Sequence, residues 1–295
     1  MIVRHLYLRR LVVVLSLSLL SVAPAHAEDR EVRLEQTIRT LESDLDARIG
    51  VLIRDTGSGW QWGYRENERF LMTSTFKSIL CGAVLERADD DLLSLKEEIP
   101  VHEEDIMDYA PVTEATAGGT MTVAELCFAT LDMSDNTAAN LLIDRLGGPQ
   151  EVTAFVRSIG DNVTRLDRTE PDLNIFDPAD PRDTTSPAAM LATWDAMLLG
   201  DVLSPSSRSQ LHDWMSHGGV TAGLLRASVP DGWIVADKSG AGDGFTRNLV
   251  AMVTPPNHAP WLVAIYVSDT PADFAARNEA VTEIGTDIVA VMQAR

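Results

Sequence analysis

Apolar side chains recur every three or four positions near each end of the chain, which is the spacing of one face of an α-helix. The first run consists of Leu34, Ile38, Leu41 and Leu45. The last run consists of Phe274, Val281, Ile284, Ile288 and Val291. The pattern therefore predicts an amphipathic helix at each end of the folded domain.

Short runs rich in β-branched and aromatic residues lie between these two helices, close to the ends of the chain. Residues 49–56 and 60–64 flank Gly57-Ser58-Gly59, a sequence typical of a hairpin turn. Three more strand-like runs come late, at residues 232–237, 245–253 and 261–268. The long middle, from about 73 to 229, has helical patterns, including a capping box at Thr122-Val123-Ala124-Glu125.

Strands at both ends with helices between them predict an α+β fold. In it an antiparallel sheet from both chain termini is flanked by the terminal helices and carries an inserted all-helical part. We place the α/β part at about residues 28–64 and 230–295 and the helical part at about 65–229, in a single domain of residues 28–295. Two domains are the alternative for a chain of this length. A functional site is expected in the cleft between the two parts.

Residues 1–27 have the pattern of a secretory signal peptide. Arg4, Arg9 and Arg10 make the start basic, residues 11–22 are apolar, and Ala25-His26-Ala27 gives a small-x-small cleavage pattern. An uncleaved signal would be a membrane anchor, but the apolar run is short for a bilayer span. We therefore expect cleavage after Ala27, a periplasmic location and no stable membrane anchor. The Arg9-Arg10 pair leaves general and twin-arginine export open.

The chain is strongly acidic, with a formal net charge of −20 at pH 7. Such a surface repels nucleic-acid phosphates and anionic lipid headgroups, so neither is an expected partner. The only lysines are Lys77, Lys96 and Lys238. An acidic, lysine-poor surface fits an organism living in salt and fits an ordinary acidic protein equally well.

The cysteines and histidines bear on disulfides and metals. Cys81 and Cys127 are the only cysteines, and in an exported protein two cysteines usually pair. A disulfide is therefore favoured over the alternative of two buried free thiols. The six histidines show no H-x-x-x-H or H-x-H spacing, so we expect no metal site and no other cofactor.

Four short polar motifs follow one another along the chain. They are Ser74-Thr75-Phe76-Lys77, Ser134-Asp135-Asn136, Glu170-Pro171-Asp172-Leu173-Asn174 and Lys238-Ser239-Gly240. Two of the three lysines lie inside these motifs, which argues against a chance origin.

Ser74 and Lys77 lie at the predicted start of a buried helix, because Ile79, Leu80 and Ala83 follow at core spacing. A separation of three residues on a helix puts the lysine beside the serine. A neutral or desolvated amine can take the hydroxyl proton and make the serine nucleophilic without a histidine. The amides at a helix N-terminus also favour an oxyanion formed at the serine. A solvated surface pair is the alternative, and the apolar surroundings argue against it.

S-x-x-K, S-D-N and K-T-G together are the signature of class A β-lactamases and penicillin-binding proteins. This chain carries all three, with Ser239 in place of the usual threonine, which keeps the hydroxyl donor. Over essentially all of residues 28–295 it resembles the class A serine β-lactamases. Further matches, including the two cysteines of a family disulfide, are residues 81–85, residues 109–113, Cys127, Arg168, Asp183, Arg247 and Arg277-Asn278.

The resemblance implies a β-lactamase/D,D-peptidase-like fold and hydrolysis of β-lactams through an acyl-enzyme. Ser74 would attack the lactam carbonyl, and Ser134 would pass a proton to the lactam nitrogen. The acylation base would be either Lys77 or Glu170 acting through water. The backbone amides of Ser74 and Ala241 would bind the oxyanion.

The resemblance also implies how the acyl group is released and the substrate held. Glu170 would activate the deacylating water, with Asn174 helping to place it. The residues implied for substrate binding are Tyr109, Asn136, Lys238, Ser239, Gly240 and Arg247. Arg168 and Asp183 would form the ion pair that closes the loop carrying Glu170, the omega loop. Gly242, with that pair intact, matches a narrow, penicillin-preferring pattern.

Two other functions share the acylation machinery. A D,D-peptidase or penicillin-binding protein would release its acyl group slowly, and a non-catalytic β-lactam sensor would stay acylated. Glu170 and Asn174 favour a hydrolase, because they supply the deacylation step. We therefore expect a monomeric class A serine β-lactamase that gives antibiotic resistance, with a small-molecule β-lactam as its partner.

Overall fold

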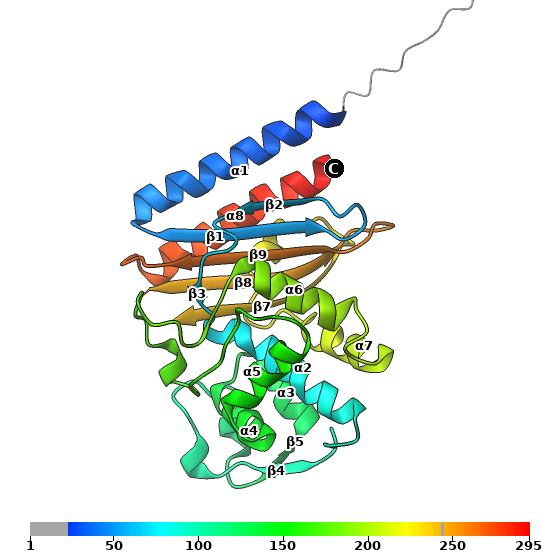
Figure 1. Ribbon diagram of the computed structural model, residues 1–295. Helices are drawn as coiled ribbons and strands as arrows, with labels where there is room; N and C mark the ends of the chain where they lie inside the picture. Colours follow the sequence, from blue (N-terminus) through cyan, green and yellow to red (C-terminus); the bar gives the residue numbers. More distant parts are fainter. Residues whose placement is uncertain (1–22, 243–244) are drawn as a thin grey trace, which may run out of the picture.

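A five-stranded antiparallel sheet in the order β2-β1-β9-β8-β7 is the centre of one half of the molecule, the upper half in Figure 1. The computed structural model describes residues 23–242 and 245–295. The strands are β1 (Arg48–Asp55), β2 (Gln61–Tyr64), β7 (Ile234–Gly242), β8 (Thr246–Thr254) and β9 (Trp261–Ser268). Strand β1 pairs with β9 along its whole length, so the two ends of the chain meet in one sheet, as the sequence predicts.

Helices α1 (Ala23–Leu45) and α8 (Phe274–Ala294) lie side by side against one face of this sheet (Figure 1). Leu34 and Ile38 from α1 and Ile284 and Ile288 from α8 are fully buried in the core between helices and sheet. Burial of each such side chain stabilises the fold by roughly 1.5–3 kcal/mol. The predicted terminal helices are confirmed, except that Phe274 is 51% exposed and lines a cleft instead of the core.

The other half of the molecule is helical and surrounds one central helix. Its helices are α2 (Phe76–Asp89), α3 (Val123–Asp132), α4 (Asn136–Leu146), α5 (Pro149–Ser158), α6 (Pro187–Leu198) and α7 (Pro205–Trp214). Helix α2 contacts all the other five, and every residue from Phe76 to Leu85 is buried. A helix that is buried all round is expected where its sequence is apolar all round. The first motif is therefore fixed at the start of the most enclosed helix.

Local sequence signals set the ends of the two helices that flank the second motif. The Thr122 hydroxyl accepts from the Glu125 amide, and the Glu125 carboxylate accepts from the Thr122 amide, which confirms the capping box at α3. Asp135 caps α4, and Gly147 ends it with a φ of +106°. Glycine suits that left-handed position because it has no Cβ.

Two small sheets were not predicted from the sequence. Strand β3 (Phe70–Leu71) pairs with β6 (Thr184–Thr185), and β4 (Glu98–Pro100) pairs with β5 (Thr120–Thr122). Runs of two or three residues carry too little periodicity to identify a strand. The β3–β6 pair is important for the site, because it joins the segment before Ser74 to the end of the omega loop.

The expected disulfide between Cys81 and Cys127 is wrong for this structure. Both cysteines are fully buried free thiols, on α2 and α3. The Cys81 thiol donates to the backbone carbonyl of Cys127 at 3.8 Å. Burial, together with the neighbouring Cys127 thiol, raises the pKa of Cys81 well above its usual value. Neutral thiols of this kind pack in a core as small apolar groups.

Most of the expected signal peptide, residues 1–22, lies outside the described residues. Helix α1 begins at Ala23, before the expected cleavage point after Ala27. In the part of the chain that the structure covers, no helix is long and apolar enough to cross a membrane.

Candidate active site

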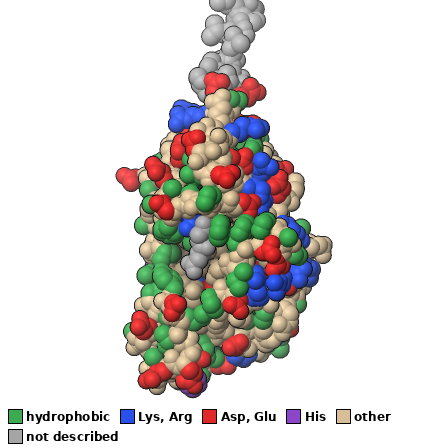
Figure 2. Space-filling view, turned by 90° about the vertical axis from the view of Figure 1, so that its left-hand side faces the viewer, with side chains coloured by type: hydrophobic (Ala, Val, Ile, Leu, Met, Phe, Trp, Pro, Cys, Tyr) green, Lys and Arg blue, Asp and Glu red, His purple; other side chains and the backbone are tan. Residues whose placement is uncertain are grey.

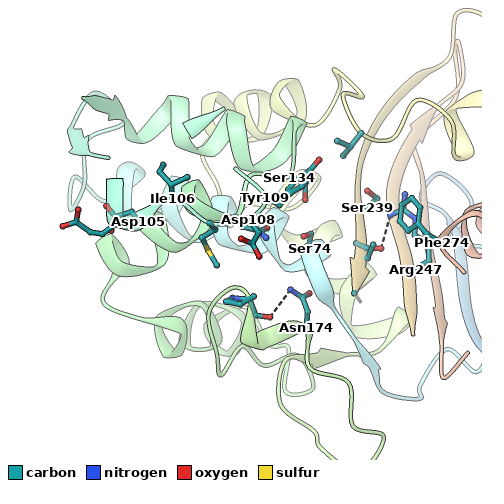
Figure 3. Close-up of a pocket in the computed structure, with 18 residues that line it drawn as sticks. Ser74, Asp105, Ile106, Asp108, Tyr109, Ser134, Asn174, Ser239, Arg247 and Phe274 are labelled. Carbon is teal, nitrogen blue, oxygen red and sulfur yellow. Dashed lines mark hydrogen bonds between the residues drawn. The ribbon is translucent and has the colours of Figure 1, made fainter. Parts of the chain in front are cut away.

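The four motifs converge on one cleft of about 700 Å³ between β7 and the helical half (Figure 3). Ser74 lies near its centre, between Ser134 on one side and Ser239 on the other (Figure 3). The predicted site residues that line the cleft are Ser74, Tyr109, Ser134, Asn136, Asn174, Ser239, Gly240, Ala241 and Arg247. Lys77, Glu170 and Lys238 are buried beneath it.

Ser74 belongs to a short 3-10 turn, η1 (Thr73–Thr75), that leads directly into α2. The residue is partly exposed, whereas Thr73, Thr75 and Phe76 around it are buried. The serine therefore lies at the N-terminal end of a helix, where the free amides and the helix dipole favour negative charge. This is the position that the sequence predicts.

Lys77 lies one turn later in α2 and is completely buried. Its Nζ donates to the Ser134 carbonyl at 2.8 Å and to Asn136 Oδ1 at 2.6 Å, and it lies 3.2 Å from Glu170 Oε1. Burial lowers the pKa of Lys77, and the charge of Glu170 opposes that shift. A lysine with a lowered pKa is better able to accept a proton at neutral pH.

Glu170 is held on both its backbone and its carboxylate. Asn174 Nδ2 donates to Glu170 Oε2 at 2.5 Å. Asn140 Oδ1 accepts from the Glu170 amide at 3.0 Å, and Asn140 Nδ2 donates to the Glu170 carbonyl at 2.9 Å. Asn174 Oδ1 is buried and has no hydrogen-bond partner among the described residues. The Glu170 carboxylate is thus held beside Lys77, and Asn174 contributes a hydrogen-bond acceptor near the carboxylate.

Asn140 was missed by the sequence analysis, although it clamps the backbone of Glu170. It lies in α4, one helical turn after Asn136, so both side chains are on the same face of the helix. That repeat of asparagine at a spacing of four residues was the only local signal. Its partner is 30 residues away in the chain, in a loop with no periodicity.

Lys238 extends from β7 and fixes the second motif. Its Nζ donates to Ser134 Oγ at 3.0 Å and to the Ser239 carbonyl at 2.8 Å. Burial lowers the pKa of Lys238 well below its usual value, and the positive charges of Lys77 and Arg247 add to that shift. The contact fixes the Ser134 hydroxyl at the wall of the cleft.

Asp135, the middle residue of the second motif, has a structural role. Its carboxylate accepts from the Ala138 amide at 2.9 Å and so caps α4. The same carboxylate accepts from the Val112 and Thr113 amides and from the Thr113 hydroxyl. It therefore holds the loop that carries Tyr109, whose side chain is 46% exposed at the edge of the cleft.

Arg247 comes from β8 and reaches the cleft across β7. Its guanidinium donates to the Gly240 carbonyl at 3.1 Å and to Asn278 Oδ1 at 2.6 Å, and the Phe274 ring lies 5.3 Å away. Burial and the charge of Arg277 lower the pKa of Arg247 to about 10, so it is protonated at neutral pH. Arg247 is the only cation among the described residues that line the cleft.

The omega loop is closed by the ion pair that the sequence predicts. Arg168 Nε and Asp183 Oδ2 are 2.5 Å apart, and Asp183 is fully buried. Asp183 Oδ1 also accepts from the Asp167 and Arg168 amides. Further along the loop, the Phe176 ring stacks on Phe245, with 5.2 Å between ring centroids. The loop is thus attached at its base and also to the end of the β7–β8 hairpin.

The mouth of the cleft carries negative charge. Glu104, Asp105 and Asp108 line it from the loop between β4 and β5. Figure 2 shows acidic side chains gathered at the lower end of the helical half, seen from the side. Among residues 23–242 and 245–295, no group of three or more His, Cys, Asp or Glu side chains is placed to hold a metal ion.

Residues 33–292 match the model of a family described as the Beta-lactamase enzyme family. Over 286 residues the chain is 51% identical to a beta-lactamase of Rhodobacter capsulatus, covering 97% of each sequence. It is 43% identical over 256 residues to Beta-lactamase CARB-3 of Pseudomonas aeruginosa, covering 87% of this chain and 89% of that protein.

Solved structures of β-lactamases are also similar to this chain. The class A beta-lactamase of the last common ancestor of Gram-negative bacteria superimposes with a TM-score of 0.85 at 51% identity, covering 88% of this chain and 99% of that chain. A beta lactamase from Xanthomonas campestris pv. campestris superimposes with a TM-score of 0.87 at 44% identity, covering 89% and 98%.

A serine and a lysine at the start of a buried helix, facing a β-strand across a cleft, are the arrangement of the serine enzymes of the β-lactamase and penicillin-binding class. This chain belongs to the β-lactamase family. It is a class A serine β-lactamase, a hydrolase, and the predicted α+β fold is confirmed.

Proposed function

We propose that the protein hydrolyses β-lactams, penicillins in preference, through an acyl-enzyme on Ser74. The observation that carries the proposal is the fixed position of Glu170, which lies 3.2 Å from Lys77 and is bound by Asn174. A serine acylated beside such a carboxylate has a base ready to activate water. D,D-peptidases and β-lactam sensors acylate without this rapid second step.

Acylation begins with attack of Ser74 Oγ on the lactam carbonyl. The hydroxyl proton passes to Lys77 or, through a water molecule, to Glu170, whose carboxylate lies 3.2 Å from the Lys77 amine. The C–N bond of the ring then breaks, and Ser134, aligned by Lys238, delivers a proton to the departing nitrogen. The step gives one product, a Ser74 ester whose acyl group still carries the amine, and the proton that Ser134 donates is replaced by the one taken from Ser74.

Deacylation uses the omega loop. Glu170 takes a proton from water, the resulting hydroxide adds to the ester carbonyl, and the Ser74 alkoxide leaves and recovers a proton. Asn174 Oδ1, buried and unpaired among the described residues, supplies a second acceptor for that water. The backbone amides of Ser74 and Ala241 bind the oxyanion in both steps.

Substrate is held by charge and by hydrogen bonds. Ser239 and Arg247 line the cleft, and the substrate carboxylate binds there, with Lys238 beneath. Asn136 Oδ1 is engaged by Lys77, so its Nδ2 is the group that donates to the carbonyl of the acyl side chain. Tyr109 covers the open edge.

A preference for penicillins follows from how tightly the lower edge of the cleft is closed. A Cβ at Gly242 would lie 3.5 Å from the Asn174 carbonyl, so even a small side chain on strand β7 would reach the omega loop. The Arg168–Asp183 pair and the Phe176–Phe245 stack hold the loop against the hairpin. Large acyl side chains therefore need the loop to move, and compact ones do not.

We also propose that the protein works as a periplasmic monomer and gives antibiotic resistance. The basic start, the apolar segment and the cleavage pattern of residues 1–27 support export. The whole cleft is assembled from one chain, so no second copy is needed to complete it.

The test is multiple turnover of a chromogenic cephalosporin and of benzylpenicillin by the purified protein, together with Glu170→Ala. We expect the unaltered protein to turn over repeatedly. Glu170→Ala is expected to acylate and then stall, with deacylation slowed by about 10²- to 10⁴-fold. Mass spectrometry of the intact protein then shows a stable adduct.

Asp172→Ala is the matched control, since it removes an exposed carboxylate from the same loop and should turn over normally. A single stoichiometric burst from the unaltered protein would favour the peptidase or sensor. Absence of an adduct on Glu170→Ala would remove Glu170 from the deacylation step.

A further inference from the structure

The residue just before the nucleophile has an unfavourable backbone conformation. Thr73 has a φ of +44°, in the left-handed region that β-branched residues rarely adopt. Such a conformation persists only where the surroundings hold it in place. The position of the Ser74 hydroxyl and of the Ser74 amide depends directly on this turn.

Asn248, on strand β8, supplies much of that restraint. Its side chain is fully buried. Its Nδ2 lies 2.8 Å from the Leu71 carbonyl, 3.1 Å from the Met72 carbonyl and 3.2 Å from Thr73 Oγ1. These three oxygens belong to consecutive residues that lead into Ser74. One amide group therefore contacts the whole approach to the nucleophile.

The same turn is pressed against strand β7 by Gly240. Gly240 and Asn248 are register partners, so their side-chain positions share one face of the sheet. A Cβ at Gly240 would lie 2.1 Å from Thr73 Oγ1 and 3.1 Å from the Ser74 amide nitrogen. The missing side chain lets the turn touch β7 beside Ala241, the second proposed oxyanion donor.

The carbonyl oxygen of the Asn248 side chain argues against a purely stabilising role for this residue. Asn248 Oδ1 is buried and has no hydrogen-bond partner among the described residues. A buried carbonyl without a partner destabilises a fold, so the surrounding structure satisfies only the NH2 end of the Asn248 side chain. Such an unsatisfied group in a native protein calls for a functional explanation.

We propose that Asn248 is a positioning residue, which holds the Thr73 turn so that the Ser74 amide faces the Ala241 amide across the oxyanion site. The proposal rests on the proposed acyl-enzyme at Ser74. It assigns Asn248 an effect on the acylation rate that passes through the backbone, without contact with the substrate.

The test compares two variants. Asn248→Leu is similar in size and has no hydrogen-bond donor. Asn248→Asp places carboxylate oxygens against the Leu71 carbonyl, the Met72 carbonyl and Thr73 Oγ1, where the amide donor was. We expect the single-turnover acylation rate to fall by about 10- to 100-fold in Asn248→Leu, because small misplacement of reacting groups has effects of that size. Affinity for a boronic acid, which forms a tetrahedral adduct on the serine, should fall in parallel. The dissociation constant of the unreacted substrate should change less than twofold.

The matched control is Thr193→Val, which removes another buried hydrogen bond, to Asp161, from helix α6. It is expected to lower the melting temperature and leave acylation and boronate affinity unchanged. If Asn248→Leu changes only the melting temperature, the positioning role is overturned. If Asn248→Asp does not fold, Asn248→Leu still decides the outcome. The serine adduct of the unaltered protein tests the proposed function separately.

Discussion

Two lysines with proposed roles in catalysis and substrate binding are buried beneath the cleft. Lys77 and Lys238 are both fully buried, and burial lowers the pKa of each. Lys77 has the Glu170 carboxylate within 3.2 Å, whereas the contacts of Lys238 are the neutral oxygens of Ser134 and Ser239. A buried cation satisfied only by neutral groups destabilises the folded state.

We therefore predict that Lys238→Met raises the free energy of unfolding by about 1–2 kcal/mol while it weakens binding of the substrate carboxylate. The gain should depend on pH. Because the pKa of Lys238 is lowered by folding, the unfolded chain binds more protons than the folded one between the two pKa values. Between these two pKa values the free energy of unfolding of the unaltered protein therefore rises with pH. The difference in stability between it and Lys238→Met becomes smaller.

Urea unfolding at several pH values measures this difference. The gap should be largest below the lowered pKa of Lys238 and smallest near the unfolded value of about 10.4. If Lys238→Met is less stable than the unaltered protein at every pH, the buried amine does not destabilise the fold. KM for benzylpenicillin, measured in parallel, reports the loss of carboxylate binding.

At the residue scale, the sequence identifies functional residues that lie close together in the chain. Ser74 and Lys77 are three residues apart, and their helix places them together whatever the rest of the fold does. Asn140 and Asn248 escape notice because an asparagine in a helix or strand has no distinctive local pattern. Their partners are 30 and about 175 residues away, and only the folded chain brings them together.

At the scale of elements, a single buried ion pair closes the base of the omega loop. Asp183 is fully buried and binds Arg168 and two backbone amides, so one carboxylate closes a loop that carries Glu170 and Asn174. The nearby Arg182–Asp180 pair is in contrast exposed on its arginine side. A buried pair and an exposed pair in one loop therefore allow a matched comparison.

We predict that Asp183→Asn lowers the free energy of unfolding by about 3 kcal/mol, because it leaves the Arg168 charge without its partner. The value of kcat for benzylpenicillin should fall about tenfold, since Glu170 loses its fixed position. Hydrogen exchange at the Asp167 and Arg168 amides should accelerate. Asp180→Asn, the control, should change neither quantity appreciably, and equal effects of the two variants would contradict the closing role of Asp183.

Apolar spacing predicted the terminal helices, and runs of β-branched and aromatic residues predicted the late strands, which are buried on both faces. Both signals failed where an element has only two or three residues. The β3–β6 pair consists of two residues on each side and depends on a contact more than a hundred residues apart. Phe274 fits the apolar spacing of α8, yet it lies beside Arg247 at the first turn, outside the core.

At the scale of the whole molecule, a strongly acidic chain also has acidic side chains at the mouth of its cleft. Glu104, Asp105 and Asp108 line the mouth, and Arg247 is the only described cation that lines the cleft. With a net charge of −20 behind them, these carboxylates repel anionic groups that extend from the acyl side chain. An ammonium group at the same place is attracted.

We therefore predict that kcat/KM ranks ampicillin, with its protonated amine, above carbenicillin, with its second carboxylate, by more than their intrinsic reactivity explains. Raising the salt concentration should narrow the difference, because charges at the mouth are exposed and screened. Asp108→Asn should reduce the ratio by about two- to threefold, the size expected of one exposed charge.

Asp44→Asn, on the outer surface of α1, is the control for net charge alone, because α1 lies against the sheet far from the helical half (Figure 1). If Asp44→Asn changes the ratio as much as Asp108→Asn does, the discrimination comes from the field of the whole protein and not from the mouth. If neither variant nor salt affects the ratio, charge at the entrance has no part in selection. The expected outcome, a change in Asp108→Asn alone, ties substrate choice to the loop between β4 and β5.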